Sequence, residues 1–170
     1  MQPISGKWHF AVKTDFEGRI SEYRARFVAR GFSQTQGLDY FETYAPTARL
    51  STLRTMLACG VQQGVNFRQL DIKTAYLNAP IDEEIYLEQP EGFKKGRGDL
   101  VCRLKRSLYG FMQSGRNWFQ CLSELLQSLE FTSSEHDRCL WTLRKGAHTC
   151  WVLEWVDDLV YGSTDHTFAS

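Results

Sequence analysis

The chain opens with two stretches whose mix of apolar and polar residues is typical of β-strands. The first is KWHFAVK, at residues 7–13, and the second is ISEYRARFVARG, at residues 20–31. Between them, DFEG at residues 15–18 has the composition of a turn. We therefore predict a hairpin at the start of the chain, followed by a polar loop over residues 34–47, which Pro46 interrupts.

Two later segments repeat apolar residues at helical spacing. The first follows Ser51, which suits an N-cap, and should end near Gly64; its apolar positions are Leu53, Met56, Leu57 and Val61. The second runs from about Gly115 to Leu129, with Ser114 as the expected cap. It carries a broad apolar face that we predict to be core: Trp118, Phe119, Leu122, Leu125, Leu126 and Leu129.

Short apolar runs that resemble strands occupy much of the remaining chain. The segment NFRQLDIK is a predicted short strand with Asp71 at its end. A turn is predicted over residues 78–84, and EIYLEQP is a further predicted strand, which Pro90 ends. A charged, glycine-rich loop, EGFKKGRGD, comes next, and CLWTLRK, CWVLEWV and LVYGS close the chain. This irregular alternation of strands and helices predicts an α+β fold, with a mostly antiparallel sheet covered by helices on one face.

Composition narrows the class of protein. The 170 residues suit one domain, with 42% hydrophobic and 24% charged residues, and no apolar run is long enough to span a membrane. The net charge is zero, which excludes a uniformly basic nucleic-acid binder but allows local basic patches. Two such clusters occur, and each could also be an ordinary solvated strand face: Arg24, Arg26 and Arg30, then Arg103, Lys105 and Arg106.

The five cysteines are scattered and form no CxxC pair, which indicates reduced thiols in an intracellular protein. One possible zinc set can be written from the sequence: His136, Cys139, His148 and Cys150. Its spacings are not those of structural zinc sites, and both cysteines fall in apolar, strand-like runs. We therefore expect no structural zinc.

The segment LEWVDDLVYG, at residues 153–162, places Asp157 and Asp158 side by side within an apolar run. Aspartate is a common turn residue, so a simple hairpin turn would explain the position. It would not explain why two like charges replace the usual Asn-Gly or Asp-Gly. The alternative is a site for Mg²⁺ or Mn²⁺, which prefer carboxylate and phosphate oxygens, with Asp71 as a third carboxylate.

Several blocks, taken in order, carry a resemblance to a known family. They are YRARFVARGFSQTQGLDYFETYAPTARLSTLR, QLDIKTAYLNAPIDEEIYLEQPEGF, VCRLKRSLYGFMQSGRNW and WVDDLVYG. Together they resemble the reverse transcriptase of copia-type LTR retrotransposons, from about Lys7 to Gly162. The resemblance implies a polymerase palm with a ferredoxin-like antiparallel sheet over about residues 51–170, and partial fingers over about residues 1–50.

The resemblance also implies roles for individual residues. Asp71, Asp157 and Asp158 would hold two Mg²⁺ ions, while a primer 3′-hydroxyl attacks the α-phosphate of a deoxynucleoside triphosphate. Tyr76 would be an aromatic gate against the ribose 2′-hydroxyl, although it could also be a packed core tyrosine. The resemblance further implies nucleotide contacts by Lys13, Arg24 and Gln113, and contacts with an RNA or DNA template and primer by Arg26, Arg103, Lys105, Arg106 and Trp155.

Some positions depart from the family pattern. Trp155 stands where Tyr or Phe is usual, and residues 112–116 read MQSGR where KQAPR is usual. The chain also stops at Ser170, so we expect the thumb and RNase H regions to be absent. Two hypotheses follow: an intracellular polymerase core, in cytoplasm, nucleus or virus-like particles, or a non-catalytic relic that acts at most as a binding module.

Overall fold

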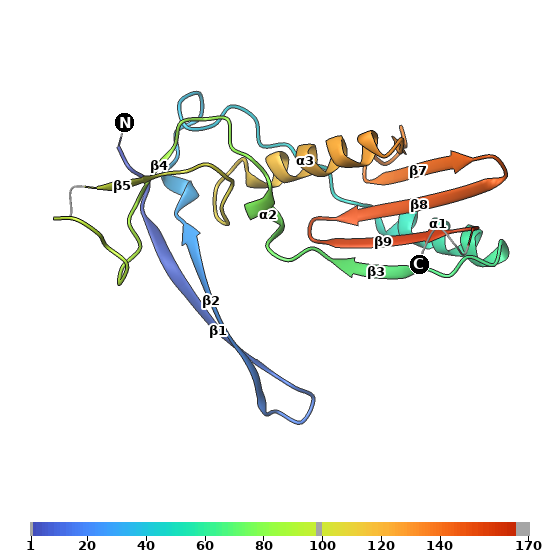
Figure 1. Ribbon diagram of the computed structural model, residues 1–170, viewed down its shortest axis with the longest axis horizontal. Coiled ribbons are helices and arrows are strands. Elements are labelled where there is room, and N and C mark those ends of the chain that lie inside the picture. Colours follow the sequence, from blue (N-terminus) through green and yellow to red (C-terminus); the bar gives the residue numbers. More distant parts are fainter. Residues whose placement is uncertain (1, 98–99, 166–170) are drawn as a thin grey trace. The chain divides into compact units, whose positions relative to one another are not determined.

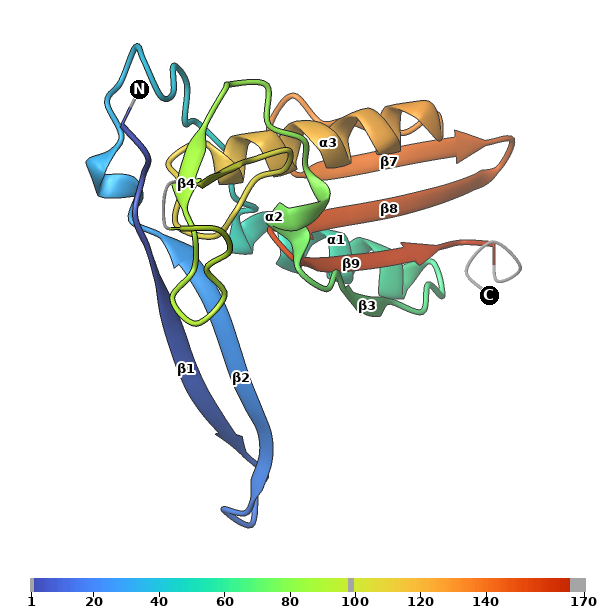
Figure 2. The same cartoon turned by 60° about the vertical axis from the view of Figure 1, so that its left-hand side comes forward.

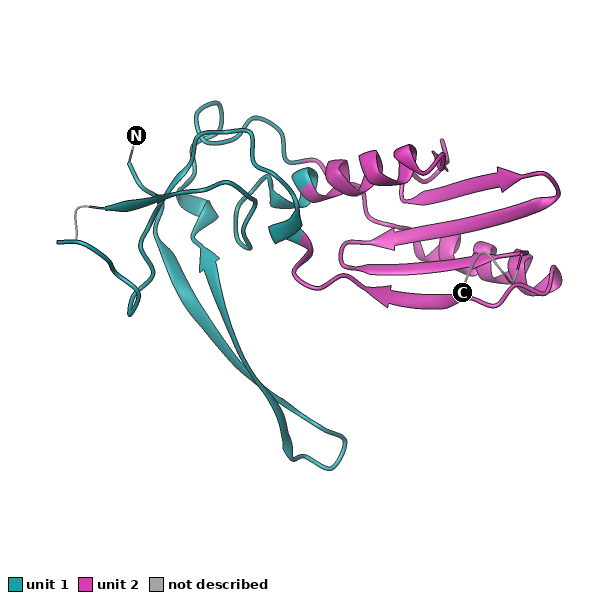
Figure 3. Ribbon diagram, viewed as in Figure 1, with its two compact units in different colours: residues 1–43, 76–117 teal, residues 44–75, 118–170 magenta. Residues whose placement is uncertain are grey.

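The computed structural model describes residues 2–97 and 100–165 of the chain. Two compact units are formed, and each combines two separate segments of the sequence (Figure 3). Unit 1 contains residues 1–43 and 76–117, and unit 2 contains residues 44–75 and 118–170. Both units contain antiparallel strand pairs, and the few helices make the protein a mixed α and β structure (Figure 1). Among the described residues, no helix has the length and apolar character needed to cross a membrane.

Unit 1 begins with the predicted hairpin, which is confirmed. Strands β1 (Gly6–Thr14) and β2 (Ile20–Ala29) pair antiparallel, and a short 3-10 helix, η1 (Gly31–Ser33), follows. The connecting turn is stabilised by the Asp15 side chain, which accepts hydrogen bonds from the backbone N–H groups of residues 17 and 19. The polar segment after η1 has no helix or strand through residue 47, as predicted.

The second segment of unit 1 returns to pack against the first. It contains β4 (Tyr86–Glu88), paired antiparallel with β5 (Val101–Arg103). Ile4 forms a parallel bridge to Leu87. Its backbone N–H donates to the carbonyl of Tyr86, and its carbonyl accepts the backbone N–H of Glu88. These contacts enclose a small apolar core whose buried members are Ile4, Ala29, Ile85, Leu87 and Phe111. Residues more than 50 positions apart therefore build one core, which a local pattern does not indicate.

Unit 2 contains a five-stranded antiparallel sheet in the order β3-β9-β8-β7-β6 (Figure 1 and Figure 2). Its strands are β3 (Arg68–Asp71), β6 (Thr132–Ser133), β7 (Leu140–Lys145), β8 (His148–Trp155) and β9 (Asp158–Ser163). The three closing strands and the strand ending at Asp71 were predicted, and β6 is too short to have left a pattern. The coarse prediction of an α+β fold with an antiparallel sheet is thus confirmed.

The helices agree with the sequence in extent but not in their caps. Helix α1 (Leu50–Gln62) starts one residue before the predicted cap Ser51, and α3 (Ser114–Ser128) includes the predicted cap Ser114. Both cap predictions were wrong, because contacts with residues outside each helix replace the expected caps. The Ser114 hydroxyl donates to the carbonyl of Leu108. A third helix, α2 (Ala75–Asn78), forms one turn that was not predicted, and it shares only Asn78 with the turn expected over residues 78–84.

Asp137 supplies the acceptor that α1 lacks at its N-terminus. Its carboxylate accepts the backbone N–H of Arg49 at 3.0 Å and that of Cys139 at 3.1 Å. Burial opposes ionisation of Asp137, but hydrogen bonds from Thr52 and from these two N–H groups outweigh it and lower its pKa. A carboxylate at the positive end of a helix is favourable for the same reason that an N-cap is.

The core of unit 2 joins α1 and α3 to the sheet. Its buried members are Ala48, Met56, Cys139 and Leu153. Partly buried residues from α1, α3, the strands and the residue before β3 pack against them: Leu53, Phe67, Phe119, Leu140, Trp151 and Val160. Of the apolar face predicted for α3, Trp118, Leu122 and Leu126 are buried, whereas Leu125 and Leu129 are more than half exposed. The predicted face was therefore somewhat too broad.

We expect Asp137→Ala to reduce the free energy of unfolding by about 1–3 kcal/mol, because it removes the capping acceptor and leaves the buried N–H of Cys139 and the part-buried N–H of Arg49 without it. Because the pKa of Asp137 is lowered in the folded state, this contribution is present above the pKa of the unfolded chain and is lost as pH falls through the folded value. Urea unfolding at pH 7 and pH 3 measures both effects. Glu135→Ala, at an exposed neighbour, is the matched control, and an equal loss in that variant would contradict the capping role.

Candidate active site

A tight turn between β8 and β9 carries the Asp157–Asp158 pair. Trp155 pairs with Asp158, which leaves only Val156 and Asp157 in the loop. Val156 has a φ of 60°, a conformation that normally requires glycine and is strained for a β-branched residue. Such strain persists only where the surrounding contacts hold it.

Both carbonyl groups of this turn are bonded to neighbouring elements. The indole Nε1–H of Trp118, in α3, donates to the carbonyl of Val156 at 2.5 Å. The backbone N–H of Ile72, just after β3, donates to the carbonyl of Asp157 at 2.7 Å. The turn is therefore tied on one side to a helix and on the other to the strand that ends at Asp71.

Asp71 lies directly opposite Asp158 in the β3–β9 pair. Residues directly opposite one another in neighbouring strands point to the same face of the sheet, and two like charges in that arrangement repel. One partner offsets part of this repulsion: the Gln69 side-chain amide donates to the Asp158 carboxylate at 2.8 Å. Asp71 is exposed, and Asp157 and Asp158 are half-buried, so all three carboxylates sit at one end of the sheet with access to solvent.

Gln69 is a residue that sequence reasoning missed. The sequence could have indicated it, because the residue two positions before Asp71 in a strand lies on the same face of the sheet as Asp71.

Trp155, in β8, also pairs with Asp158, and its side chain is 46% exposed. Within residues 2–97 and 100–165, no group of three or more His, Cys, Asp or Glu side chains is arranged as a ready-made metal site.

The alternative zinc set does not come together. Cys139 lies across from Glu154, and its carbonyl accepts the Glu154 backbone N–H, while Cys150 lies four residues before Glu154 in β8. At roughly 3.3 Å per residue, this separates the two cysteines by about 13 Å, too far for one zinc ion. Burial raises the pKa of both thiols, that of Cys139 to about 12 with help from the nearby Glu154 and Asp137 carboxylates.

In unit 1, the two residues predicted to grip a triphosphate lie on one face of the β1–β2 hairpin. Lys13 pairs with Glu22, and Arg24 points to the same face two residues further along β2. Glu22 bonds to both: its carboxylate lies 2.9 Å from Nη2 of Arg24 and 3.6 Å from Nζ of Lys13. Hydrogen bonding to Arg24 is the main cause of the lowered pKa of Glu22. Both basic groups thus hold a carboxylate anion in this structure.

Arg26 and Tyr76, two further predicted residues, meet at a third side chain that sequence reasoning missed. The guanidinium carbon of Arg26 lies 5.6 Å from the ring centroid of Tyr109. The Tyr109 ring in turn packs against the Tyr76 ring, with centroids 4.8 Å apart and planes at 55°. Tyr109 lies in the SLYG segment, where nothing in the local pattern distinguishes it from an ordinary core tyrosine.

Gln113 is fully buried in unit 1. Its amide nitrogen donates to the carbonyl of Asp39, and its amide oxygen accepts from Gln34 at 3.0 Å. The Gln34 oxygen also accepts the backbone N–H of Met112. The side chain therefore holds two loops together, and the nucleotide contact predicted for Gln113 would require this network to open.

The three residues of the second basic cluster, Arg103, Lys105 and Arg106, differ in their contacts. Lys105 is exposed, and Arg103 is exposed with Glu84 at 3.9 Å. Arg106 instead uses its guanidinium to bond the carbonyl of Asn78 at 2.7 Å. Its side chain thus ties β5 and its following loop to the end of α2, while the nucleic-acid contacts of all three stay predictions.

Comparison with known proteins decides the family. The model of the family described as reverse transcriptase (RNA-dependent DNA polymerase) matches residues 1–169. The chain belongs to the reverse transcriptase family. It is 36% identical over 163 residues to the Retrovirus-related Pol polyprotein from transposon RE2 of Arabidopsis thaliana, covering 95% of this chain and 11% of that protein.

Other relatives of this reverse transcriptase domain are also transposon proteins. It is 34% identical over 166 residues to the Pol polyprotein from transposon TNT 1-94 of Nicotiana tabacum, covering 96% of this chain and 12% of that protein. It is 38% identical over 113 residues to the Ty1-ER2 Gag-Pol polyprotein of Saccharomyces cerevisiae, covering 64% of this chain and 6% of that protein. The resemblance to copia-type retrotransposon reverse transcriptases is thus confirmed. No solved structure matches.

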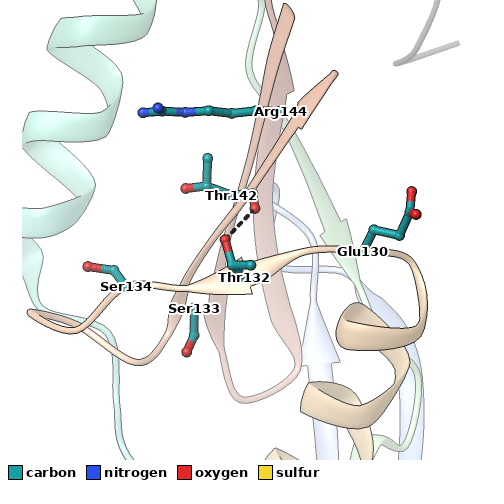
Figure 4. Close-up of a pocket in the computed structure, with 6 residues that line it drawn as sticks. All are labelled: Glu130, Thr132, Ser133, Ser134, Thr142 and Arg144. Atoms are coloured by element: carbon teal, nitrogen blue, oxygen red, sulfur yellow. Dashed lines mark hydrogen bonds between the residues drawn. The ribbon is translucent and has the colours of Figure 1, made fainter. Parts of the chain in front are cut away.

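A surface hollow elsewhere in the reverse transcriptase domain does not resemble a reaction site. It has a volume of about 410 Å³ beside β6 and β7 and is lined by Glu130, Thr132, Ser133, Ser134, Thr142 and Arg144. Figure 4 shows that the Ser133 and Ser134 side chains point away from each other. The hydroxyl of Thr132 is used in a bond to the carbonyl of Thr142. These groups do not converge on a common point.

A buried carboxyl group lies close to the Asp-Asp turn. Glu154, two residues before Val156, is 3% exposed, and neither of its oxygens has a hydrogen-bond partner among the residues that the structure describes. The Trp141 indole and the Cys139 thiol are near it without forming a bond of good geometry. Burial is the main cause that raises the pKa of Glu154 to about 8, so the group is mostly protonated at neutral pH.

We expect the stability of the protein to fall as pH rises towards 8. A carboxyl whose folded pKa is raised stabilises the fold below its unfolded pKa of about 4.5, and that stability is lost as pH rises through the folded value of about 8. The slope is up to about 1.4 kcal/mol per pH unit within this window. Urea unfolding at pH 5, 6, 7 and 8 measures it.

Glu154→Gln should abolish this slope, because the neutral amide has nearly the same shape and no proton to lose. Glu135→Gln changes an exposed carboxyl in the same unit and should leave the slope unchanged. A slope of equal size in the wild type and in Glu154→Gln would mean that another group is responsible.

Proposed function

We propose that this chain is the nucleotidyl-transfer core of an RNA-directed DNA polymerase. The observation that carries the proposal is the alignment of Asp71 opposite Asp158, beside Asp157 in a strained and doubly anchored turn. Membership of the reverse transcriptase family supports assigning this carboxylate group to phosphoryl chemistry. A turn that served only to reverse the chain would gain nothing from a strained valine and two adjacent like charges.

The chemistry of these donors fits Mg²⁺ or Mn²⁺. Both ions prefer oxygen ligands, and Mg²⁺ is usually held by one or two carboxylates together with substrate phosphates rather than by a complete protein cage. Such a partial site agrees with carboxylates that neighbour one another but form no three-ligand cluster within the described ranges. When bound, the divalent ions would supply positive charge to the attacking and leaving oxygens of an in-line displacement.

The protein's own residues would then act by position. Asp71, Asp157 and Asp158 would hold the ions, and Gln69 would keep the Asp158 carboxylate oriented through its amide. Trp118 and Ile72, which bond the turn carbonyls, would keep the turn from shifting during the reaction. Since misplacement by about 1 Å can cost two orders of magnitude in rate, this anchoring is part of the proposed mechanism.

In unit 1, Lys13 and Arg24 would bind the triphosphate of the incoming nucleotide. Their contact with Glu22 supports this, because it orients both cations towards an anion on one hairpin face. A triphosphate carries more negative charge than a carboxylate and suits the planar guanidinium of Arg24. Tyr76 would act as the gate against a ribose 2′-hydroxyl. Arg26, Arg103, Lys105, Arg106 and Trp155 would contact the template and primer, mostly through phosphates.

Primer extension on an RNA template tests the proposal. We expect Asp157→Asn to reduce extension by at least about 100-fold and to weaken Mg²⁺ binding measured by calorimetry, because a preorganised charge in the active site is lost. Asp82→Asn makes the same exchange at an exposed aspartate of unit 1 and should change neither result.

The assay is run with this chain and with a chain that includes the sequence following Ser170 in its source transcript, because the chain covers only 11–12% of its plant relatives. We expect weak, salt-sensitive primer–template binding by this chain and stronger extension by the longer one. Wild-type activity that survives Asp157→Asn would refute the proposed site. Nucleic-acid binding without extension by either length would favour the non-catalytic binding module.

Glu22→Gln tests the triphosphate assignment separately. Removing the carboxylate frees Lys13 and Arg24, so affinity for a deoxynucleoside triphosphate should rise by about 2- to 5-fold, the scale of an exposed ion pair. Glu17→Gln, which removes the ion pair with Arg19 at the hairpin turn, is the control. Fluorescence titration with a labelled nucleotide measures the affinity, and an unchanged value in Glu22→Gln would show that this face does not bind triphosphate.

A further inference from the structure

The backbone around Tyr109 is fixed against the end of the β1–β2 hairpin. Its carbonyl accepts the backbone N–H of Ala29, at the end of β2, at 2.8 Å. The next residue, Gly110, has a φ of 97°, and a Cβ there would lie 2.1 Å from the carbonyl oxygen of Ala29. Only glycine allows this approach, so the glycine requirement fixes the backbone of Tyr109 against the hairpin.

The Tyr109 ring has contacts on two sides within unit 1. Tyr76 packs against it at 4.8 Å in a tilted arrangement, and the Arg26 guanidinium lies 5.6 Å from its centroid. The tilted ring pair and the cation–π contact are both favourable geometries. Tyr109 is half-buried, as is Tyr76, so the stack is partly open to solvent.

We infer that Tyr109 is a positioning residue that holds the Tyr76 ring, and with it the selection between deoxyribose and ribose. This inference rests on the proposed function, in which Tyr76 is the gate. A ring can exclude a 2′-hydroxyl only if it does not yield, and Tyr76 stands on a one-turn helix that provides little rigidity of its own. The firmly held Tyr109 ring supplies the support behind it.

The test measures kcat/KM for a deoxynucleotide and for the matching ribonucleotide in the primer-extension assay, with the wild type and three variants. Tyr109→Leu removes the ring and should lower the deoxy-to-ribo ratio by about 3- to 10-fold, the contribution expected of one aromatic pair. The loss should come from faster ribonucleotide use, with kcat for the deoxynucleotide nearly unchanged. Tyr109→Phe keeps the ring and should retain the wild-type ratio.

Tyr86→Leu is the matched control, because it removes a half-buried ring of unit 1 whose hydroxyl bonds Glu84. If Tyr109→Leu does not fold, Tyr109→Met fills a similar volume without a ring and gives the same prediction. A structural role alone would lower both rates together and leave their ratio unchanged, and that outcome overturns the inference. Absence of extension by the wild type at either length would instead refute the proposed function.

Discussion

Unit 2 depends on one electrostatically unfavourable arrangement, the pairing of Asp71 with Asp158 across neighbouring strands. Two carboxylates in this position repel, so the strand pair needs stabilisation from elsewhere. The Gln69 amide offsets part of the repulsion, and the bonds from Ile72 and Trp118 hold the adjoining turn. The strained φ of Val156 fits the same account, because strain is kept only where contacts over-determine the backbone.

Burial of Glu154 adds a second constraint to the same hairpin. An ionised carboxylate without a hydrogen-bond partner among the described residues would be costly there, so the Glu154 carboxyl is mostly protonated at neutral pH. The hairpin that presents two half-buried aspartates at its tip therefore also carries a buried carboxyl group, Glu154, three residues before Asp157. Within five residues of chain, one carboxyl group is thus buried and two have access to solvent.

In unit 1, four basic side chains have partners within the unit. Glu22 forms ion pairs with Lys13 and Arg24. Arg26 makes a cation–π contact with the Tyr109 ring, and Arg106 donates a hydrogen bond to the carbonyl of Asn78. These contacts orient long cationic side chains that would otherwise move freely, and under the proposed function this would reduce the entropy lost on binding a phosphate. If Lys13 and Arg24 bind triphosphate as proposed, their ion pairs with Glu22 would have to be exchanged for phosphate, which would limit the affinity of this hairpin face.

The sequence by itself determined the strands of the hairpin, the two long helices, the closing strands and the family, because each leaves a local pattern or an ordered set of motifs. It also indicated Asp71 and the Asp157–Asp158 pair, since a strand end and a turn are local features. The caps of α1 and α3 were wrong, because Asp137, 88 positions from Arg49, supplies the acceptor for α1, and the Ser114 hydroxyl bonds Leu108 instead of capping α3. Only the tertiary structure decided that residues 76–117 join residues 1–43 in one core, that Gln113 is buried, and that Tyr109 stands between Tyr76 and Arg26. These facts depend on strand register and on packing between distant segments, which no local pattern of residues encodes.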